Sequence, residues 1–224
     1  MNISGLRERV EAARLHERSD TVVRDWLTHR SPDLHRAIVS ATAVSAPDVS
    51  DTELLETLMP FIDAYIGHVP DMLEAADAVA EAARIREQLL PVLKVAEHFF
   101  LQPPDLPADH QGMLALLDEA YLAHRLVEEV NDRYVGHGCG PLIPLDNTRA
   151  NLIVHQLLGE PFSNELDAIV ADALKGLVPE SLFEGSAFNE YRKKVDPEAC
   201  RLLWQQWSCM SQKLGVEIRW RGAS

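Results

Sequence analysis

Apolar residues recur at intervals of three and four along most of the chain, and this spacing is typical of amphipathic helices. The longest unbroken run begins at Met113 and ends at Tyr134, and it covers about six helical turns. Asp118, Arg125 and Asp132 are expected on the opposite, outer face of that helix. Ser50 and Glu53 form a second signal, a capping box in which two side chains satisfy free backbone N–H groups at a helix start. The pattern predicts an all-α protein, a multi-helix bundle of about eight or nine helices.

Capping residues, Gly and Pro predict where individual helices begin and end. Pro32, Pro70 and Pro197 each stand where a first helical turn is expected, and Pro91 should kink or restart its helix. The helix that follows Ser50 should therefore end near Gly67. Further helices are predicted over residues 112–135, 146–158, 163–175 and 197–214, with a weaker helical or turn segment over 180–194.

The chain is predicted to form one domain over residues 1–224, with residues 102–110 as a candidate point of subdivision. This connector, QPPDLPADH, contains three Pro, which exclude a helix there. Residues 216–220 alternate as a strand would, but no partner strand is evident. We expect them to form a short extended C-terminal tail. The buried core should contain Met113, Leu116, Val127, Val130, Leu203, Trp207 and Met210.

Composition restricts the classes of partner and compartment. Among 224 residues, 35 Asp and Glu outweigh 21 Lys and Arg, which gives a formal charge of −14 and disfavours nucleic acid as a partner. No signal peptide and no uncharged apolar run of membrane-spanning length is present, so no membrane association is expected. Three scattered Cys form neither a disulfide framework nor a zinc motif, and we predict a cytoplasmic protein.

Sequence signatures of common catalytic sites are absent. The chain has no dinucleotide-binding Gly motif, no phosphate-binding lysine loop, no His-Glu-x-x-His and no Cys-x-x-Cys. None of the nine His has an acidic residue three positions before it, which excludes the usual di-iron pattern of helical bundles.

Two lines of polar residues flank the apolar faces of neighbouring helices. His124, Glu128 and Asn131 share one face of the 112–135 helix, and Thr148, Asn151 and His155 share one face of the 146–158 helix. If the intervening loop makes an antiparallel hairpin, Glu128 lies level with about residue 153 and His124 with about residue 157. We therefore expect the two lines to meet, with an imidazole bonded to Glu128 or Asn131.

Three interpretations of these lines are open. They are a structural hydrogen-bond network, a pocket for a ligand or substrate, or a divalent-metal site held by His124, Glu128 and His155. Arg149, in the first turn of its helix, needs a carboxylate partner such as Glu128 or Asp132, because a cation there opposes the helix dipole.

The Gly- and Pro-rich loop over residues 136–145 is apolar and should pack against the body. Its Cys139 is a candidate thiol nucleophile, with His137 or His155 as the base, and a tight structural loop is the alternative. Asp63, His68 and Asp71 are expected at a helix junction, where they could cap helices or bind a metal.

Two functions are consistent with these observations. The first is a non-enzymatic binding or regulatory protein that acts on a protein partner or a small ligand, and self-association as a homodimer is a further form of this hypothesis. It requires no cofactor. The alternative is a small metal-dependent helical enzyme with a His/Glu site between the 112–135 and 146–158 helices.

Overall fold

The computed structural model describes residues 1–15, 19–40, 50–104, 110–143, 147–196, 198 and 209–218. Within these residues the chain forms nine α-helices, one 3-10 helix and two short strands, so the predicted all-α multi-helix class is confirmed. The elements are α1 (Ile3–Arg14), α2 (Ser19–Ala37), β1 (Ile38–Ser40), α3 (Asp51–Ala83), α4 (Arg86–Leu101), α5 (Met113–Gly136), α6 (Thr148–Leu158), α7 (Phe162–Leu177), η2 (Glu180–Glu184), α8 (Ser186–Lys194), α10 (Met210–Lys213) and β2 (Val216–Ile218).

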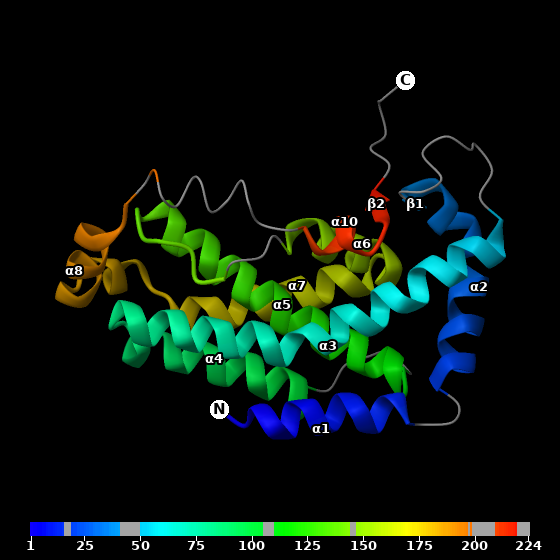
Figure 1. The fold of residues 1–224 in the computed structure, drawn as a ribbon, viewed down its shortest axis with the longest axis horizontal. Helices are drawn as coiled ribbons and strands as arrows, with labels where there is room; N and C mark the ends of the chain where they lie inside the picture. The colour runs from blue at the N-terminus through cyan, green and yellow to red at the C-terminus, as the bar shows by residue number, and fades with distance from the viewer. Residues whose placement is uncertain are drawn as a thin grey trace.

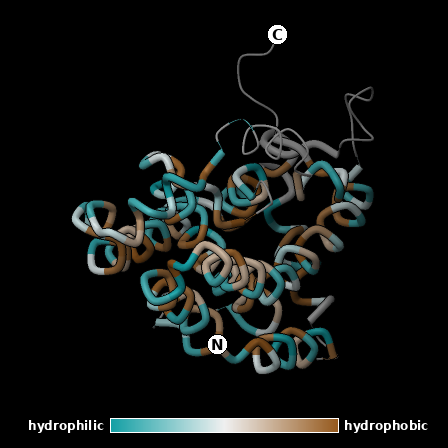
Figure 2. The backbone as a smooth tube through the Cα atoms, turned by 60° about the vertical axis from the view of Figure 1, so that its left-hand side comes forward, coloured by the Kyte–Doolittle hydropathy of each residue, from teal (hydrophilic) through white to brown (hydrophobic). Residues whose placement is uncertain are grey.

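Helix α5 is the centre of the bundle, and it contacts α1, α2, α3, α4, α6 and α7 (Figure 1). The long helices α3, α4, α5 and α7 run along the longest axis of the molecule, and α2 crosses them at one end. Helices α6 and α10 lie on the opposite side of this layer from α1. Figure 2 shows hydrophobic and hydrophilic residues alternating along the helical coils of the backbone. The hydrophobic faces of the helices meet around α5, which is buried along almost its whole length.

Proline does not end helices here as the sequence predicted. Helix α3 continues through Pro60 and Pro70 and ends only at Ala83, where the following residue, Arg84, has a φ of 62° in the left-handed region. The predicted end near Gly67 is therefore wrong, and so are a helix start at Pro32 and a restart at Pro91, which lie inside α2 and α4.

The reason lies in how much apolar surface α3 buries. A Pro in a helix interior costs about 3 kcal/mol, and each large apolar side chain that becomes buried contributes about 1.5–3 kcal/mol. The buried face of α3 begins at Leu54 and reaches Ala80, with residues on both sides of each Pro. Continuing the helix keeps all of that face against its neighbours. The predicted start is correct, because Ser50 Oγ accepts a hydrogen bond from the Glu53 N–H at 3.3 Å.

The predicted core is confirmed where the structure describes it. Met113, Leu116, Val127, Val130 and Met210 are all buried. Leu203 and Trp207 lie outside the described residues, as does most of the predicted 197–214 helix. Helices α5, α6 and α7 agree closely with the predicted 112–135, 146–158 and 163–175 segments, and η2 and α8 fall within 180–194.

The C-terminal segment has a partner strand, which the sequence did not reveal. Strand β2 pairs antiparallel with β1, with Val216 opposite Ser40 and Ile218 opposite Ile38. This contact joins the end of the chain to the end of α2. Helices α4 and α5, on either side of the Pro-rich connector, also pack against each other. Residues 105–109 of that connector lie outside the described residues.

Candidate functional site

Polar side chains are buried at the centre of the bundle, where α3, α5 and α6 meet. His124, Glu128, Asn131 and Asn151, all members of the two predicted lines, are 0%, 7%, 5% and 2% exposed. Burial of polar groups is costly unless they are hydrogen-bonded, so their partners decide what this region does.

The two predicted lines do meet, at Glu128 and Asn151. The Asn151 side-chain amide donates from Nδ2 to Glu128 Oε2 at 2.6 Å. The Tyr65 hydroxyl donates to Asn151 Oδ1 at 2.7 Å, which brings α3 into the same group. Three helices are thus linked by side chains that are shielded from water.

His124 continues this group toward α3 and the start of α6. Its Nε2 donates to the backbone carbonyl of Tyr65 at 2.9 Å, which leaves Nδ1 to accept from Asn147 Nδ2 at 3.2 Å. Burial lowers the pKa of His124 to about 3, so the ring is neutral at physiological pH. We call Tyr65, His124, Glu128, Asn147 and Asn151 the polar network.

The predicted antiparallel arrangement of these two polar lines is wrong. His124 lies beside Asn147 and Glu128 beside Asn151, rather than near residues 157 and 153. The residue numbers of the bonded partners rise in the same direction on both helices, whereas an antiparallel hairpin would make them run in opposite directions. The chain after α5 folds back along the helix, because the Leu142 N–H donates to Asn131 Oδ1 at 2.8 Å and so α6 begins level with His124. The expected bond between an imidazole and Glu128 or Asn131 is not formed within the described part of the chain.

A second polar group adjoins the network on the α7 side. Arg125 donates to Glu128 and to Glu129 Oε1, the latter at 2.8 Å. It also donates to Asp167 Oδ1 at 3.1 Å. The Tyr121 hydroxyl donates to the same Asp167 oxygen at 3.0 Å. The sequence had placed Arg125 on the outer face of α5. It turns inward because three carboxylates surround its guanidinium.

His155 belongs to this second group rather than to the polar network. Its Nε2 lies 3.3 Å from Asn164 Oδ1 and 3.7 Å from Asp167 Oδ2. The predicted metal ligands His124, Glu128 and His155 are therefore not brought together as one set. Both nitrogens of His124 are already engaged, and among the described residues no three His, Cys, Asp or Glu side chains are placed to hold a metal ion.

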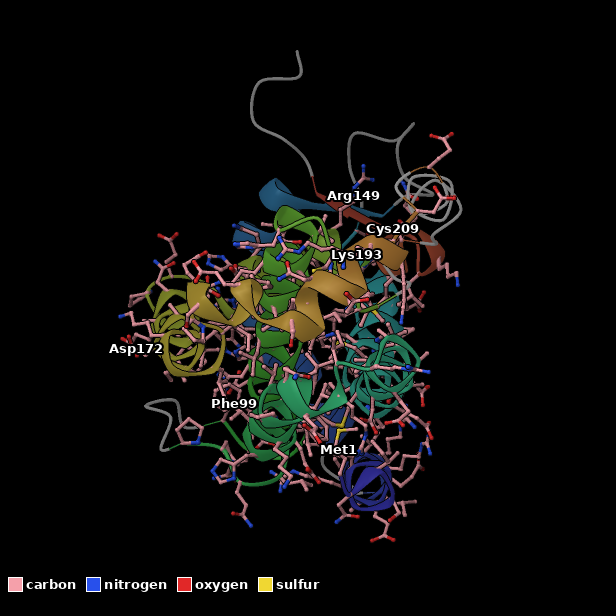
Figure 3. The ribbon with its side chains drawn as sticks, turned by 90° about the vertical axis from the view of Figure 1, so that its left-hand side faces the viewer. Met1, Phe99, Arg149, Asp172, Lys193 and Cys209 are labelled. Atoms are coloured by element: carbon pink, nitrogen blue, oxygen red, sulfur yellow. The ribbon has the colours of Figure 1, made fainter. Side chains whose placement is uncertain are left out.

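Arg149 does not make the predicted ion pair. Its side chain is exposed at the start of α6, on the outer surface in Figure 3, and it pairs with no carboxylate in the described ranges. Arg125, from α5 itself, is the cation bonded to Glu128. Because Arg125 supplies this charge from one turn away on the same helix, Glu128 needs no cation from α6.

The 136–145 loop packs against the body as predicted over its described part, and its two candidate residues have structural contacts. The His137 ring stacks on Phe183 at a centroid distance of 3.8 Å, and its Nε2 lies 2.9 Å from Glu180 Oε2. Cys139 is 4% exposed, and burial raises the pKa of its thiol, which keeps it protonated. A nucleophilic thiolate is not favoured in these surroundings.

Two buried acids on α5, Asp118 and Glu119, each contact a basic side chain. Asp118 was expected on the outer face but is 1% exposed, and its Oδ2 lies 2.7 Å from His110 Nδ1. Glu119 binds Arg9 of α1 at 2.6 Å, and burial nevertheless raises the pKa of Glu119 to about 7. These contacts fasten α1 and His110, which lies three residues before α5, to the bundle.

An open cavity lies beside the polar network, between α3 and α10. Its volume is about 330 Å³, and we call it the His68 cavity; it is lined by Arg14, Ala64, Gly67, His68, Asp71, Met210, Lys213 and Leu214. The His68 ring stacks on His124 with centroids 5.6 Å apart and planes within 9° of parallel. His68 thus forms the contact between this cavity and the network. The predicted helix junction at His68 is wrong, since the residue lies in the middle of α3.

His68 has hydrogen-bonding capacity that its neighbours do not use. Its Nδ1 is shielded from solvent and has no partner, and neither ring nitrogen bonds a residue of the described ranges. An unpaired acceptor is tolerated in a protein interior more readily than an unpaired N–H. The favoured tautomer therefore carries its hydrogen on Nε2, which makes Nε2 a donor. Burial lowers the pKa of His68, so the ring is neutral.

A second cavity, of about 380 Å³, lies between α1, α2 and α3 near the start of α5. Its wall includes Arg14, Arg24, Met59, Asp63 and Met113. Arg14 lines both cavities and is anchored to Asp63 by two hydrogen bonds of 2.6 and 2.9 Å.

The chain matches no protein-family model, and no curated protein or solved structure is significantly similar to it. In the part of the chain that the structure describes, no helix combines the length and the apolar character needed to cross a bilayer.

Proposed function

We propose that this protein is a non-enzymatic helical binding or regulatory protein that takes a small ligand in the His68 cavity. The observation that carries this proposal is the combination of an open cavity of about 330 Å³ with a polar group, His68, whose ring nitrogens have no partner among the described residues. Natural ligand pockets are mostly apolar, have volumes of about 300–1,000 Å³ and contain a few polar groups that orient the ligand.

The polar network supports this proposal because its side chains, unlike His68, are already hydrogen-bonded to one another. Glu128 is bonded to Arg125 and Asn151, and both nitrogens of His124 are engaged. Groups bonded in this way hold helices together and have little capacity left for a substrate. The network accordingly serves as the rigid support behind His68.

Methyl NMR of the full chain, with the methionine methyl groups labelled by carbon-13, tests the proposal. Met210 lines the His68 cavity and Met59 lines the second cavity, so each methyl reports on one of them. A fragment library of anionic, neutral and cationic compounds is added at millimolar concentration. We expect at least one fragment to shift the Met210 resonance while the Met59 resonance stays in place.

Two alanines of α3 provide matched variants. Ala64 lines the cavity, and Ala78 is exposed on the same helix. Ala64→Phe should abolish the Met210 shift, whereas Ala78→Phe should leave it unchanged. The proposal is wrong if no fragment shifts Met210, or if the shift persists in an Ala64→Phe variant whose circular dichroism shows that it is folded.

We further propose a reducing compartment, the cytoplasm, as the place where the protein acts. Cys139 and Cys209 are buried free thiols, as is usual for proteins kept under reducing conditions. The formal charge of −14 argues against nucleic acid as a partner. A protein partner or a second copy of the chain stays a prediction.

A further inference from the structure

The charges that line the His68 cavity are unequally compensated. Arg14 is paired with Asp63 and Glu11, and Asp71 accepts a hydrogen bond from Arg7 at 2.9 Å. Lys213 is exposed and has no counter-ion in the described ranges. Burial is the main cause that lowers the pKa of His68; the Asp71 carboxylate opposes this shift, and the Lys213 ammonium adds to it. Among the charged residues that line the cavity, Lys213 is therefore the cation without a counter-ion in the described part of the chain.

The rest of the wall is largely apolar. Met210, Leu214 and Ala64 supply hydrocarbon surface, and Gly67 adds backbone without a side chain. A cavity of about 330 Å³ has room for roughly ten water molecules, which corresponds to a small organic molecule. A ligand that satisfies both parts of the wall has an apolar body and one polar end.

We propose that the His68 cavity binds a small organic monocarboxylate, with its carboxylate on the Lys213 ammonium and the His68 Nε2–H and its hydrocarbon part against Met210 and Leu214. This inference rests on the proposed function and names its ligand class. A single negative charge matches the single uncompensated cation. A second charge would meet the carboxylate of Asp71 and the overall charge of −14.

Calorimetric titration of the full chain with hexanoate, hexanamide and hexylamine tests the inference, because the three compounds share a chain length and differ in charge. Hexanoate should bind, hexanamide should bind at least tenfold more weakly, and hexylamine should give no signal. Acetate should bind at least tenfold more weakly than hexanoate, since it lacks the apolar body. Inorganic phosphate should not compete with hexanoate.

Lys213→Met removes the charge and keeps the length of the side chain, and it should weaken hexanoate at least tenfold while leaving hexanamide unchanged. Lys94→Met is the matched control, because Lys94 is exposed on α4 away from the cavity, and it should leave both affinities unchanged. Equal binding of hexanoate and hexanamide, tighter binding of hexylamine or phosphate, or an unaffected Lys213→Met variant would overturn the inference.

The failure of this inference can be told apart from the failure of the proposed function. If neutral or cationic fragments shift the Met210 methyl and are blocked by Ala64→Phe while hexanoate does not bind, the ligand class is wrong and the cavity is still a binding site. If no fragment of any charge shifts Met210, both are wrong.

Discussion

Tyr65 and His124 are in direct contact at the centre of the bundle: their ring centroids lie 4.2 Å apart, and the backbone carbonyl of Tyr65 accepts the His124 Nε2–H. The carbonyl fixes the neutral tautomer of His124, because only a protonated Nε2 can donate to it. The opposite nitrogen then accepts from Asn147, and the His68 ring stacks on the His124 ring. The uncharged imidazole of His124 therefore connects α5 to α3 and to the start of α6.

This arrangement predicts an acid-sensitive stability. Burial lowers the pKa of His124 to about 3, whereas the ordinary value in the unfolded chain is 6.5. Between these values the unfolded state binds a proton that the folded state does not. The contribution of the neutral His124 to the free energy of unfolding is therefore complete above pH 6.5 and is lost as the pH falls toward 3. The loss should reach up to about 3 kcal/mol at pH 4.

Urea unfolding at pH 7, 5.5 and 4 measures this contribution when the full chain is compared with His124→Gln. The variant is less stable at pH 7 but should lose less unfolding free energy between pH 7 and pH 4. Other titrating groups, including Glu119, are shared by the two proteins and cancel in the comparison. Equal losses in the two proteins would show that His124 is not the group responsible.

Removal of the Tyr65 hydroxyl should destabilise the protein, and removal of the Tyr134 hydroxyl should not. Both residues are fully buried, but the Tyr65 hydroxyl donates to Asn151, whereas the Tyr134 hydroxyl has no partner. Tyr65→Phe should lower the free energy of unfolding by about 1 kcal/mol or more, because Asn151 Oδ1 loses its donor. Tyr134→Phe should be neutral or stabilising. Thermal and urea unfolding of both variants decide this, and equal losses would contradict the prediction.

Glu128 and Glu129 are adjacent partners of Arg125 that should differ in their effect on stability. The side chain of Glu128 is 9% exposed and that of Glu129 is 39% exposed. Glu128→Ala leaves Asn151 and Arg125 short of an acceptor and should cost about 1–3 kcal/mol. Glu129→Ala should cost less than about 1 kcal/mol, as is usual for exposed ion pairs. A Glu129→Ala loss as large as that of Glu128→Ala in urea unfolding would count against the network.

A charge at the centre of α5 should prevent folding. Val130 is 0% exposed in the core, so Val130→Asp would bury an unpaired carboxylate at a cost of several kcal/mol. Val22→Asp is the control, because Val22 is 39% exposed on α2. Circular dichroism should show an unfolded Val130→Asp variant and a normally folded Val22→Asp variant. An unchanged melting temperature for Val130→Asp would contradict the position of α5 in the core.

Features that depend on residues close together in the chain could be predicted from the sequence. Three-and-four spacing correctly gave α5, α6 and α7, because an amphipathic face is determined by residues close together in the chain. The same spacing brought Glu128 and Asn151 together correctly, since each lies beside an apolar face that had to be buried. The Ser50 cap is likewise a local interaction and was predicted correctly.

Features that depend on distant segments could not be predicted in this way. Pro70 remains within α3 because burial along the whole helix outweighs a local penalty that sequence rules treat as decisive. The position of α6 along α5 follows the path of the preceding loop, in which the Leu142 N–H donates to Asn131 Oδ1. The His68 cavity requires α10, which comes from the other end of the chain. Its only sequence signal was a His at helical spacing within an otherwise apolar face.

Nitrogen-15 NMR of the imidazole rings tests the central claim most directly, because it observes His68 itself. The full chain is titrated with hexanoate, and His98 serves as the internal control, since it is exposed on α4. We predict that hexanoate shifts the Nε2 resonance of His68 in a saturable manner and leaves the resonances of His98 unchanged. A His68 Nε2 resonance that does not move, or that moves no more than that of His98, would contradict binding of a carboxylate in the His68 cavity.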